Sequence, residues 1–507
     1  MDTSTEKIGQ LITHIRQERG LTQAEFATRL RTSQSAVNRI EHGKQNLSIE
    51  MLGRISDVLN KQLISLSGEA VNLRVEGGHE LHGDITLKRS KNAAVGLLCA
   101  SLLNYGVTRF RSFPRIEEVY RIIEVLESIG VQVKWSGEND LEIRRPERLD
   151  LANLDAEAAR KTRSVLMFIG PLLHDYQSFK IPYAGGCKLG TRTVAPHLYA
   201  LEAFGVSILA TKGNYNIKVQ RQVADRIPLY ETGDTVTENV LMAAARQAEE
   251  TTVEFASGNY AIQDVCFFLQ KLGVSIDGIG NTKLRIRGVP FIKKNITYAP
   301  TEDPIEAMFF VSAAIVTNSS ITIRRVPIEF MTLELLKLQK MGLHYDQSAR
   351  YKADNGKTDL VDLTIHKHND RLKALPDKLH PNVFPAGINA DNLPYFVPIA
   401  GVAHGRTLVH DWMYENRAIY YTEMTKVGMQ VELADPHRLY ITGPTTFSKA
   451  DVVCPPALRP ASLLLIGMLA ANGISTLRNI YTINRGYEDI AERLNSLGAR
   501  ITVLHEI

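Results

Sequence analysis

Cysteine is scarce in this chain: four occur among 507 residues, and none forms a Cys-x-x-Cys pair. So few cysteines exclude a disulfide scaffold, and the missing pair argues against a zinc site built from thiolates. A long apolar run is also missing, because the uncharged stretch from Pro460 to Leu477 is interrupted by Gly467, Asn472 and Gly473. We therefore expect no membrane-spanning segment.

Neither sign of charge is in large excess. The 59 Lys and Arg against 55 Asp and Glu give a net charge of +4, too small for a general binder of nucleic acids or membranes. The first residues, MDTSTEKIGQ, lack the basic and then apolar profile of a signal peptide. With 44% hydrophobic and 22% charged residues, the composition is that of a globular protein, and its length suggests about three domains. These features predict a soluble, cytoplasmic protein.

The first sixty-five residues carry a helical pattern of their own. Gly20 ends a first helix, Thr22 begins a second, and Thr32 or Ser33 caps a third that ends near Gly43. The expected core positions are Ala24, Phe26, Ala27, Leu30, Val37 and Ile40. Short helices joined by short turns predict a helix-turn-helix. The segment LTQAEFATRLRTSQSAVNRIEHGK resembles the repressor-like family of DNA-binding domains.

In that family the start of the third helix enters the major groove of DNA. The resemblance implies that Gln23 fixes a phosphate, and that the bases are read by Ser33, Gln34, Ser35, Asn38 and Arg39. Charge adds little support, because residues 1–65 hold nine Lys and Arg against seven Asp and Glu. The alternative is a helical module that serves protein contacts. As a DNA binder, such a module would normally act in a homodimer.

The rest of the chain repeats a pattern in which a helix, a glycine and a strand follow one another. It occurs six times, as LESIGVQV, LEAFGVSI, LQKLGVSI, LQKMGLHY, MTKVGMQV and LNSLGARI. The glycine suits the left-handed position that ends a helix, and the alternating residues after it suit a strand. In five copies a polar turn and a second strand follow, which predicts hairpins. The six glycines are Gly130, Gly205, Gly273, Gly342, Gly428 and Gly498.

A second pattern alternates with the first: an apolar helix, a polar turn and a strand, again six times. Examples are AAVGLLCASLLNYGVTRFR and AMFFVSAAIVTNSSITIRR. These helices are apolar nearly all round, so we expect them to be buried. Each repeat of roughly seventy residues therefore has the order β-α-β-α-β-β. Six repeats predict an α/β protein with three repeats in each of two lobes.

Four motifs make the repeat more specific. They are KRSKNAAVGLL, KTRSVLMFIGPLL, IPYAGGCKLGTRTVAPHLYALEAFGV and INRGYEDIAERL. Together with the six repeats they resemble the enolpyruvyl transferases, over about residues 70–507. The match is closer to the branch that acts on UDP-N-acetylglucosamine than to the branch that makes 5-enolpyruvylshikimate 3-phosphate, which lacks the Gly-Gly-Cys loop.

The resemblance implies a two-lobed inside-out α/β barrel with the active site in the cleft between the lobes. A small all-α domain precedes it. The expected domains are the helix-turn-helix at 1–65, a linker at 66–72, lobe one at 73–90 and 298–507, and lobe two at 91–297.

The implied reaction moves the enolpyruvyl group of phosphoenolpyruvate to the 3-hydroxyl of UDP-N-acetylglucosamine, releases phosphate, and needs no metal or other cofactor. Phosphoenolpyruvate carries a phosphate and a carboxylate, which call for several cations. The resemblance assigns Lys91, Arg192, Arg417 and Arg485 to these groups. It adds six substrate-binding residues, which are Asn92, Arg163, His197, Gly233, Thr237 and Arg459.

Two residues carry the proton transfers that the resemblance implies. Cys187, in GGCKLGTR, lies beside Lys188 and Arg192, and neighbouring cations lower a thiol pKa. We expect it to protonate the vinyl carbon of phosphoenolpyruvate as its loop closes. Asp391, in HPNVFPAGINADNLPYF, would take the proton of the acceptor hydroxyl. It also suits a helix N-cap, and the two roles are compatible.

Cys99 and Cys266 lie in apolar helical runs, so we interpret them as structural, whereas Cys454 beside two prolines stays open.

Several positions depart from the family pattern on the acceptor or lid side. Ala195 and Ala457 stand where the family has aspartates, Arg89 replaces a glycine, and the phosphate loop reads ETGDTVT over 231–237. These departures leave two alternatives open. The enzyme could use another uridine nucleotide in secondary metabolism. The transferase body could also be a weak or inactive sensor of a nucleotide sugar that controls the helix-turn-helix.

Overall fold

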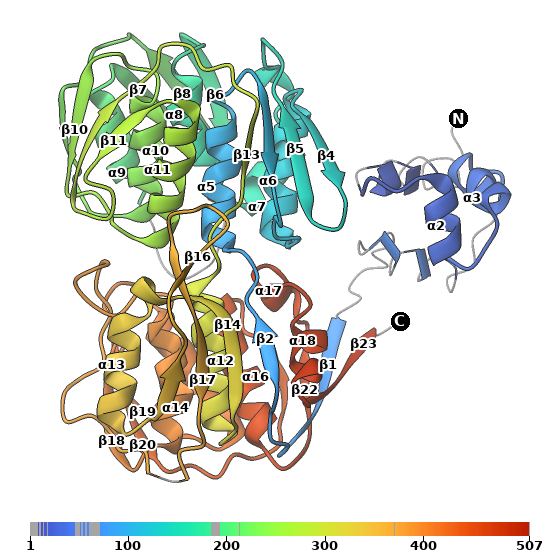
Figure 1. Cartoon of the computed structure of the whole chain (residues 1–507), viewed down its shortest axis with the longest axis vertical. Coiled ribbons are helices and arrows are strands. Elements are labelled where there is room, and N and C mark those ends of the chain that lie inside the picture. The colour runs from blue at the N-terminus through green and yellow to red at the C-terminus, as the bar shows by residue number, and fades with distance from the viewer. Residues whose placement is uncertain are drawn as a thin grey trace.

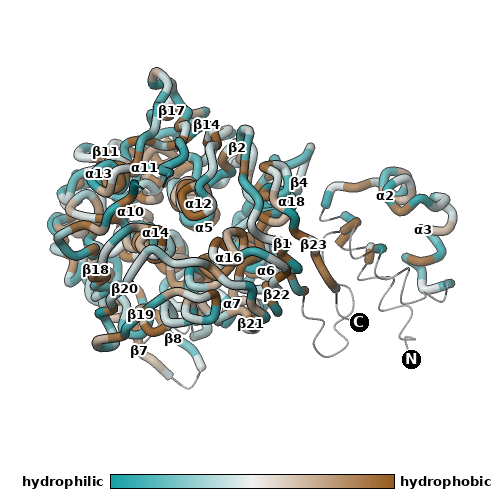
Figure 2. The backbone as a smooth tube through the Cα atoms, turned by 90° about the horizontal axis from the view of Figure 1, so that it is seen from below, coloured by the Kyte–Doolittle hydropathy of each residue, from teal (hydrophilic) through white to brown (hydrophobic). Residues whose placement is uncertain are grey.

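The computed structural model describes residues 9, 12–13, 15–17, 19–45, 51, 54–55, 58–59, 71–183, 193–211, 213–369 and 371–505. Two lobes lie along the long axis, and the N-terminal module lies to one side of both (Figure 1, Figure 2). In the described ranges, no helix combines the length and apolar character needed to cross a membrane.

The N-terminal module contains α2 (Gln23–Arg29) and α3 (Gln34–Glu41). Thr22 and Glu25 form a reciprocal capping box at the start of α2, and Ser33, not Thr32, caps α3 through the Ala36 N–H. The core residues are Ile12, Ile15, Phe26, Ala27, Leu30, Val37, Ile40, Ile55 and Leu59. The prediction for Ala24 is wrong. It is exposed, because the buried side of α2 is formed by Phe26, Ala27 and Leu30.

Lobe two contains three sheets, with strand orders β13-β3-β5-β4, β6-β8-β7 and β11-β12-β10-β9. Its strands are β3 (Val107–Phe110), β4 (Gln132–Ser136), β5 (Asp140–Arg144), β6 (Ser178–Pro182), β7 (Val206–Thr211), β8 (Asn214–Val219), β9 (Arg226–Pro228), β10 (Glu250–Glu254), β11 (Ser275–Asp277), β12 (Lys283–Arg287) and β13 (Ile296–Tyr298). Its helices are α5 (Lys91–Ser101), α6 (Glu117–Ser128), α7 (Ala156–Lys161), α8 (Ile169–Leu172), α9 (Ala195–Glu202), α10 (Asp234–Ala244) and α11 (Tyr260–Leu272), with 3-10 turns η1 (Leu151–Asn153) and η2 (Ser164–Phe168).

Lobe one also contains three sheets, with orders β21-β22-β1-β23, β15-β17-β14-β2 and β18-β20-β19, and β16 pairs with β17. Its strands are β1 (Val71–Gly77), β2 (Asp84–Thr86), β14 (Ile321–Pro327), β15 (Tyr345–Gln347), β16 (Tyr351–Lys352), β17 (Asp359–Ile365), β18 (Gly405–His410), β19 (Gln430–Asp435), β20 (Arg438–Gly443), β21 (Asp451–Val453), β22 (Gly473–Arg478) and β23 (Arg500–His505). Its helices are α12 (Pro304–Val316), α13 (Thr332–Met341), α14 (Phe396–Val402), α15 (Arg417–Tyr421), α16 (Leu458–Ala470), α17 (Tyr481–Asn484) and α18 (Ile490–Ser496), with η3 (Ile328–Phe330), η4 (Leu393–Tyr395) and η5 (Thr422–Val427).

The mixed α/β fold and its repeats are confirmed. The five predicted hairpins are present, as β4–β5, β7–β8, β11–β12, β15–β17 and β19–β20. All six repeat glycines have positive φ angles, between 75° and 103°. A side chain at these positions would strain the backbone, which explains the recurring glycine.

Exchanged strands join the two lobes, a feature that the repeat pattern did not predict. β2 precedes the first helix of lobe two but pairs parallel with β14 in lobe one. In the opposite direction, β13 precedes α12 of lobe one but pairs parallel with β3 in lobe two. The sixth repeat obtains its missing strand from β1, which lies antiparallel between β22 and β23. Each lobe is therefore completed by strands that are distant in sequence.

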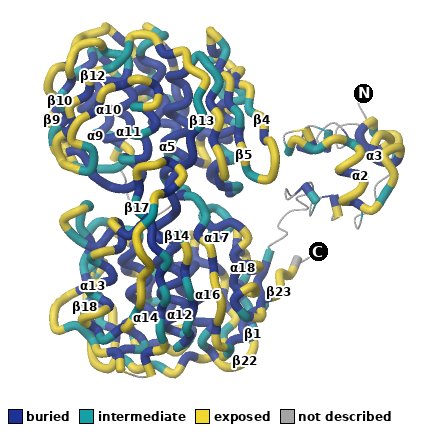
Figure 3. The backbone as a smooth tube through the Cα atoms, in the orientation of Figure 1, coloured by how far each residue is buried: buried dark blue, intermediate teal, exposed yellow. Residues whose placement is uncertain are grey.

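The apolar helices lie inside the lobes, as predicted (Figure 3). Every residue of α12 is buried, as are Ala93–Ser101 of α5 and Arg459–Leu469 of α16. These three helices bring their N-terminal ends, and with them Lys91, Asp303 and Arg459, to one region between the lobes.

Candidate active site

Lys91 is the first residue of α5, and the Ser90 hydroxyl caps this helix by accepting the Ala93 N–H. The Lys91 N–H donates to Asp303, which is itself the N-cap of α12 (3.3 Å). The start of a helix in each lobe therefore fixes the backbone of Lys91. Burial lowers the pKa of Lys91, while the carboxylates of Glu118 and Asp391 act in the opposite direction.

Glu118, near the start of α6, joins Lys91 to a second cation. Its carboxylate accepts hydrogen bonds from the Arg485 guanidinium at 2.7 Å and from the Thr162 hydroxyl at 2.8 Å. Burial alone would raise the pKa of Glu118, but the charges of Lys91 and Arg485 outweigh it, and the pKa is lowered. Arg485 follows α17 in lobe one, so this ion pair bridges the two lobes.

Asp391 faces two arginines. One carboxylate oxygen accepts from Arg459 Nη2 at 3.4 Å, and the other lies 3.8 Å from Arg417 Nη1. The Asp391 side chain is 27% exposed, whereas those of Arg459 and Arg417 are 9% and 1% exposed. The backbone N–H of Asp391 donates to Asn389 Oδ1, which orients the turn. Asp391 thus joins two buried cations and stays accessible.

Buried partners hold both arginines. Arg417 donates to both oxygens of Asp411, at 2.6 and 2.9 Å, and its guanidinium lies 4.0 Å above the Tyr414 ring. These contacts occupy Nε and Nη2 of Arg417, so Nη1 is the nitrogen that faces Asp391. Arg459 Nη1 donates to the Tyr487 hydroxyl at 3.0 Å.

Polar side chains of lobe two lie on the same side of the site as Asp391. Asp234, at the start of α10, accepts from the Ser257 hydroxyl at 2.6 Å and from Asn259 Nδ2 at 2.9 Å. Burial raises the pKa of Asp234, and the charge of Asp391 adds to the rise. Asn92 Nδ2 donates to the hydroxyl of Tyr260 at 3.0 Å, and Tyr260 is buried.

A separate group surrounds His197 in α9. Its ring nitrogens contact Thr235 Oγ1 and Asn239 Nδ2, both at 3.2 Å. Burial, assisted by the charge of Arg163, lowers the pKa of His197 to about 4, so the ring is neutral. Arg163 donates to the Thr193 carbonyl at 2.6 Å, just before Ala195.

Two of the remaining predicted site residues lie at the start of α10, and the other two lie outside the described residues. Gly233 is the N-cap of α10, and the buried Thr237 hydroxyl donates to its carbonyl at 2.7 Å and accepts the Ser257 N–H. Thr237 therefore holds the turn at the start of α10. Cys187 and Arg192 lie outside the described residues.

The structure thus brings Asp391 together with Lys91, Arg417, Arg459 and Arg485, and we call this lysine and the three arginines the cation group. Sequence reasoning missed the partners that hold them, which are Glu118, Asp234, Tyr260, Asp303, Asp411 and Tyr487. Asp234 lies in a segment already marked as a departure, and Tyr487 lies in the INRGYEDIAERL motif, but no motif contained the other four.

The predicted base-reading residues of the module, Ser33, Gln34, Ser35, Asn38 and Arg39, are exposed. Gln23, the predicted phosphate contact, donates to Glu41 at 2.7 Å. Glu41 also pairs with the buried Arg16, so Gln23 helps to fix α2 against α3.

The cation group suits a small, doubly anionic molecule. Three arginines and a lysine can neutralise a phosphate and a carboxylate, and the Asp391 carboxylate beside them is placed to accept a proton.

The lowered pKa of Lys91 predicts the pH dependence of anion binding. Above this pKa, which lies below the ordinary 10.5, Lys91 loses its charge, and affinity for phosphoenolpyruvate should fall. The free energy of unfolding responds in the opposite direction. Between the lowered pKa of Lys91 in the folded protein and its ordinary pKa of 10.5 in the unfolded chain, the unfolded chain binds more protons. The contribution of Lys91 to stability therefore rises with pH in this range. Calorimetric titration with phosphoenolpyruvate from pH 7 to 10.5 checks the first effect. Lys91→Arg should flatten the curve, and an unchanged curve would contradict the assignment.

Comparisons with known proteins agree with this geometry. A family model described as EPSP synthase (3-phosphoshikimate 1-carboxyvinyltransferase) matches residues 75–494, and a helix-turn-helix model matches residues 12–66. The UDP-N-acetylglucosamine 1-carboxyvinyltransferase of Bradyrhizobium diazoefficiens is 31% identical, over 84% of this chain and 96% of its own length. The enzyme of the same name from Treponema pallidum is 29% identical, over 84% of this chain and 98% of its own. The enolpyruvyl transferase NikO from Streptomyces tendae superposes with a TM-score of 0.74 at 22% identity, covering 87% of this chain and all of that one.

Proposed function

Because the chain belongs to the EPSP synthase family of 1-carboxyvinyltransferases, we propose that it transfers the enolpyruvyl group of phosphoenolpyruvate to the 3-hydroxyl of UDP-N-acetylglucosamine. Phosphate is the second product. The observation that carries this proposal is the cation group beside Asp391, which both lobes build: Arg459 and Arg417 face Asp391, and Lys91 lies between Asp391 and Arg485 in charge contact with both. A reaction on a nucleotide sugar that feeds peptidoglycan synthesis belongs to the cytoplasm.

The reaction is addition followed by elimination. Asp391 takes the proton of the acceptor hydroxyl as its oxygen attacks C2 of phosphoenolpyruvate, and Cys187 gives a proton to C3. The tetrahedral intermediate keeps its phosphate and carboxylate, and the cations stabilise both. Loss of a proton from C3 and departure of phosphate then form the vinyl ether. The role of Cys187 rests on the GGCKLGTR motif.

One assay tests the function directly: phosphate release from phosphoenolpyruvate with a panel of uridine nucleotides. Release with UDP-N-acetylglucosamine supports the proposed acceptor. Release with a different uridine nucleotide would keep the transferase and change its substrate. If phosphoenolpyruvate binds and no nucleotide releases phosphate, the transferase body acts as a sensor.

Restoring the missing acid at Ala195 tests how far the acceptor site has diverged. Ala195 starts α9 beside Thr193, whose carbonyl accepts from Arg163. An unpaired buried polar group costs about 1–3 kcal/mol, so Ala195→Asp should lower the Michaelis constant for UDP-N-acetylglucosamine about five- to a hundredfold if the site is only weakened. Steady-state kinetics measures this Michaelis constant. The affinity for phosphoenolpyruvate is the control and should stay unchanged. A loss of activity with the best acceptor would indicate a rebuilt site.

We further propose that the N-terminal module binds DNA through the exposed start of α3, supported by the match to the helix-turn-helix model. As a dimer it should select a short palindrome with half-sites about one helical turn apart. Arg39→Ala and Asn38→Ala should each cost about 1–3 kcal/mol of specific binding and little non-specific binding. Random-site selection followed by fluorescence anisotropy measures both, with Arg29→Ala, an exposed charge on α2, as control. Selection that enriches no motif would leave the module a protein-contact domain.

A further inference from the structure

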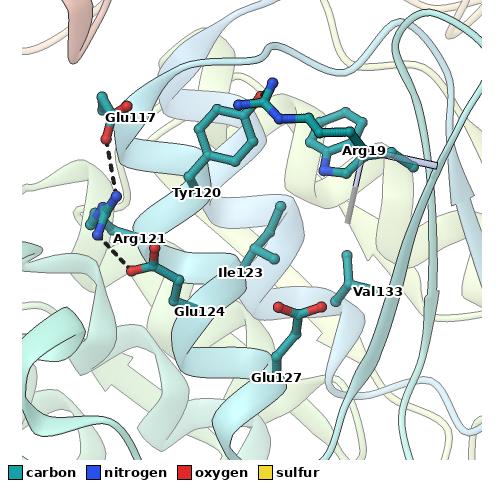
Figure 4. Close-up of a pocket in the computed structure, with 9 residues that line it drawn as sticks. Arg19, Glu117, Tyr120, Arg121, Ile123, Glu124, Glu127 and Val133 are labelled. Atoms are coloured by element: carbon teal, nitrogen blue, oxygen red, sulfur yellow. Dashed lines mark hydrogen bonds and ion pairs between the residues drawn. The ribbon is translucent and has the colours of Figure 1, made fainter. Parts of the chain in front are cut away.

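The helix-turn-helix module contacts lobe two on a small face that combines α6 and β4 (Figure 4). We call this the docking face and define it by Tyr120, Ile123, Val133 and Trp135. Arg19 of the module donates to the Tyr120 hydroxyl at 2.5 Å, and its guanidinium lies 4.6 Å from the centre of the Tyr120 ring. The two parts are therefore joined by a specific polar contact and an aromatic one.

The fit at the docking face is close. A Cβ atom placed on Gly20 would lie 2.5 Å from the Trp135 carbonyl oxygen, and Gly20 has a positive φ of 66°. On the rim, Arg121 pairs with Glu117 at 3.2 Å and with Glu124 at 2.7 Å. Acidic side chains around an aromatic floor suit a docked arginine.

The opposite side of α6 belongs to the candidate active site. Tyr120 and Glu118 are two residues apart in one helix, so they point to opposite sides. Glu118 is 7% exposed and accepts from Arg485 of lobe one. One helix therefore contacts the module with one side and the cation group with the other.

The N-terminal end of α6 is also tied to lobe one through Glu488. The Arg115 N–H donates to one oxygen of Glu488 at 3.2 Å, and Lys88 Nζ donates to the other at 2.8 Å. Glu118 accepts from one nitrogen of the Arg485 guanidinium, Nη2. A substrate phosphate bound by Arg485 would bring a second negative charge to the same guanidinium, and this charge weakens the contact that ties the start of α6 to lobe one.

We propose that phosphoenolpyruvate binding releases the module from the docking face and thereby weakens its binding to DNA. This inference rests on the proposed function. In the docked state α3 lies on the side of the module away from the lobes, so its base-reading residues are open to a duplex (Figure 1). Docking fixes the orientation of α3 relative to the transferase lobes. In the proposed dimer this sets how the two α3 helices meet their half-sites, so losing that preorganisation lowers affinity. Because coupling is reciprocal, the duplex weakens phosphoenolpyruvate binding by the same factor.

The test measures the affinity of the full chain for the duplex enriched by random-site selection, with and without saturating phosphoenolpyruvate. Fluorescence anisotropy should show a loss of at least about fivefold, the lower end of typical coupling between sites. Calorimetry with phosphoenolpyruvate, with and without the duplex, should show the same factor.

Two variants identify the route. Tyr120→Phe keeps the ring but removes the oxygen that accepts from Arg19, and Arg19→Ala removes the donor. Both should bind the duplex more weakly without phosphoenolpyruvate and lose the response to it. Arg29→Ala, on the same module but away from Tyr120, should keep the response.

Each outcome is informative. Heat from phosphoenolpyruvate with an unchanged duplex affinity overturns the coupling and leaves the transferase intact. A response that survives in both Tyr120→Phe and Arg19→Ala also overturns it. The absence of any heat overturns the transferase function together with the coupling, and the absence of duplex binding overturns the DNA-binding function together with it.

Discussion

Replacing Asp391 by asparagine should lower kcat about 10²–10⁴-fold, the range that a general base contributes. The amide keeps the shape of the side chain and can accept the hydrogen bond from Arg459 through its single oxygen, with its NH2 group then facing Arg417. It cannot take the acceptor proton. Asp391→Asn also removes a negative charge beside two buried cations, so phosphoenolpyruvate should bind at least as tightly. The expected signature is a lost kcat with a preserved Michaelis constant for phosphoenolpyruvate.

The measurement is phosphate release with the best acceptor of the panel, together with thermal unfolding to check the fold. Asp346→Asn is the matched control, because Asp346 is 80% exposed and pairs with His366 on the surface of the same lobe. A kcat for Asp391→Asn within a few-fold of the unaltered protein would remove Asp391 as the base.

Cys187→Ser should lower turnover by a similar factor of about 10²–10⁴, because a serine hydroxyl is a far poorer proton donor than a thiol. Fosfomycin, an epoxide that mimics phosphoenolpyruvate, should alkylate Cys187 selectively, and faster with the acceptor bound. The other three cysteines are internal controls. Cys99, Cys266 and Cys454 are buried, and burial raises the pKa of the Cys454 thiol to about 12.

Mass spectrometry of the digested protein locates the adduct. Modification of Cys187 alone is expected, since a thiolate is the nucleophile and the buried thiols stay protonated. No adduct at Cys187 under saturating acceptor would remove its proposed role in the loop and as the acid.

Local patterns in the sequence were enough to predict the elements of this protein. The six glycines end helices in the left-handed conformation, the apolar helices are buried, and five hairpins form where a polar turn separates two strands. The reason is that a helix end, a cap or a hairpin depends on residues a few positions apart. The cations were assigned by the resemblance of short segments around them to the enolpyruvyl transferases, and these segments are also local in the sequence.

The tertiary structure alone decided what those elements do together. Glu118 and Arg485 are 367 positions apart, and no periodicity indicated that they would pair across the lobes. The same holds for Arg19 on Tyr120. The resemblance implied that residues 73–90 belong to lobe one, but the structure decided that β1 pairs with β22 and β23, β2 with β14, and β13 with β3. Long-range partners follow from how complete lobes pack, and many pairings satisfy the same local pattern. The sequence by itself therefore determined the repeat and the chemistry of its motifs, whereas packing decided which charges meet and where the module lies.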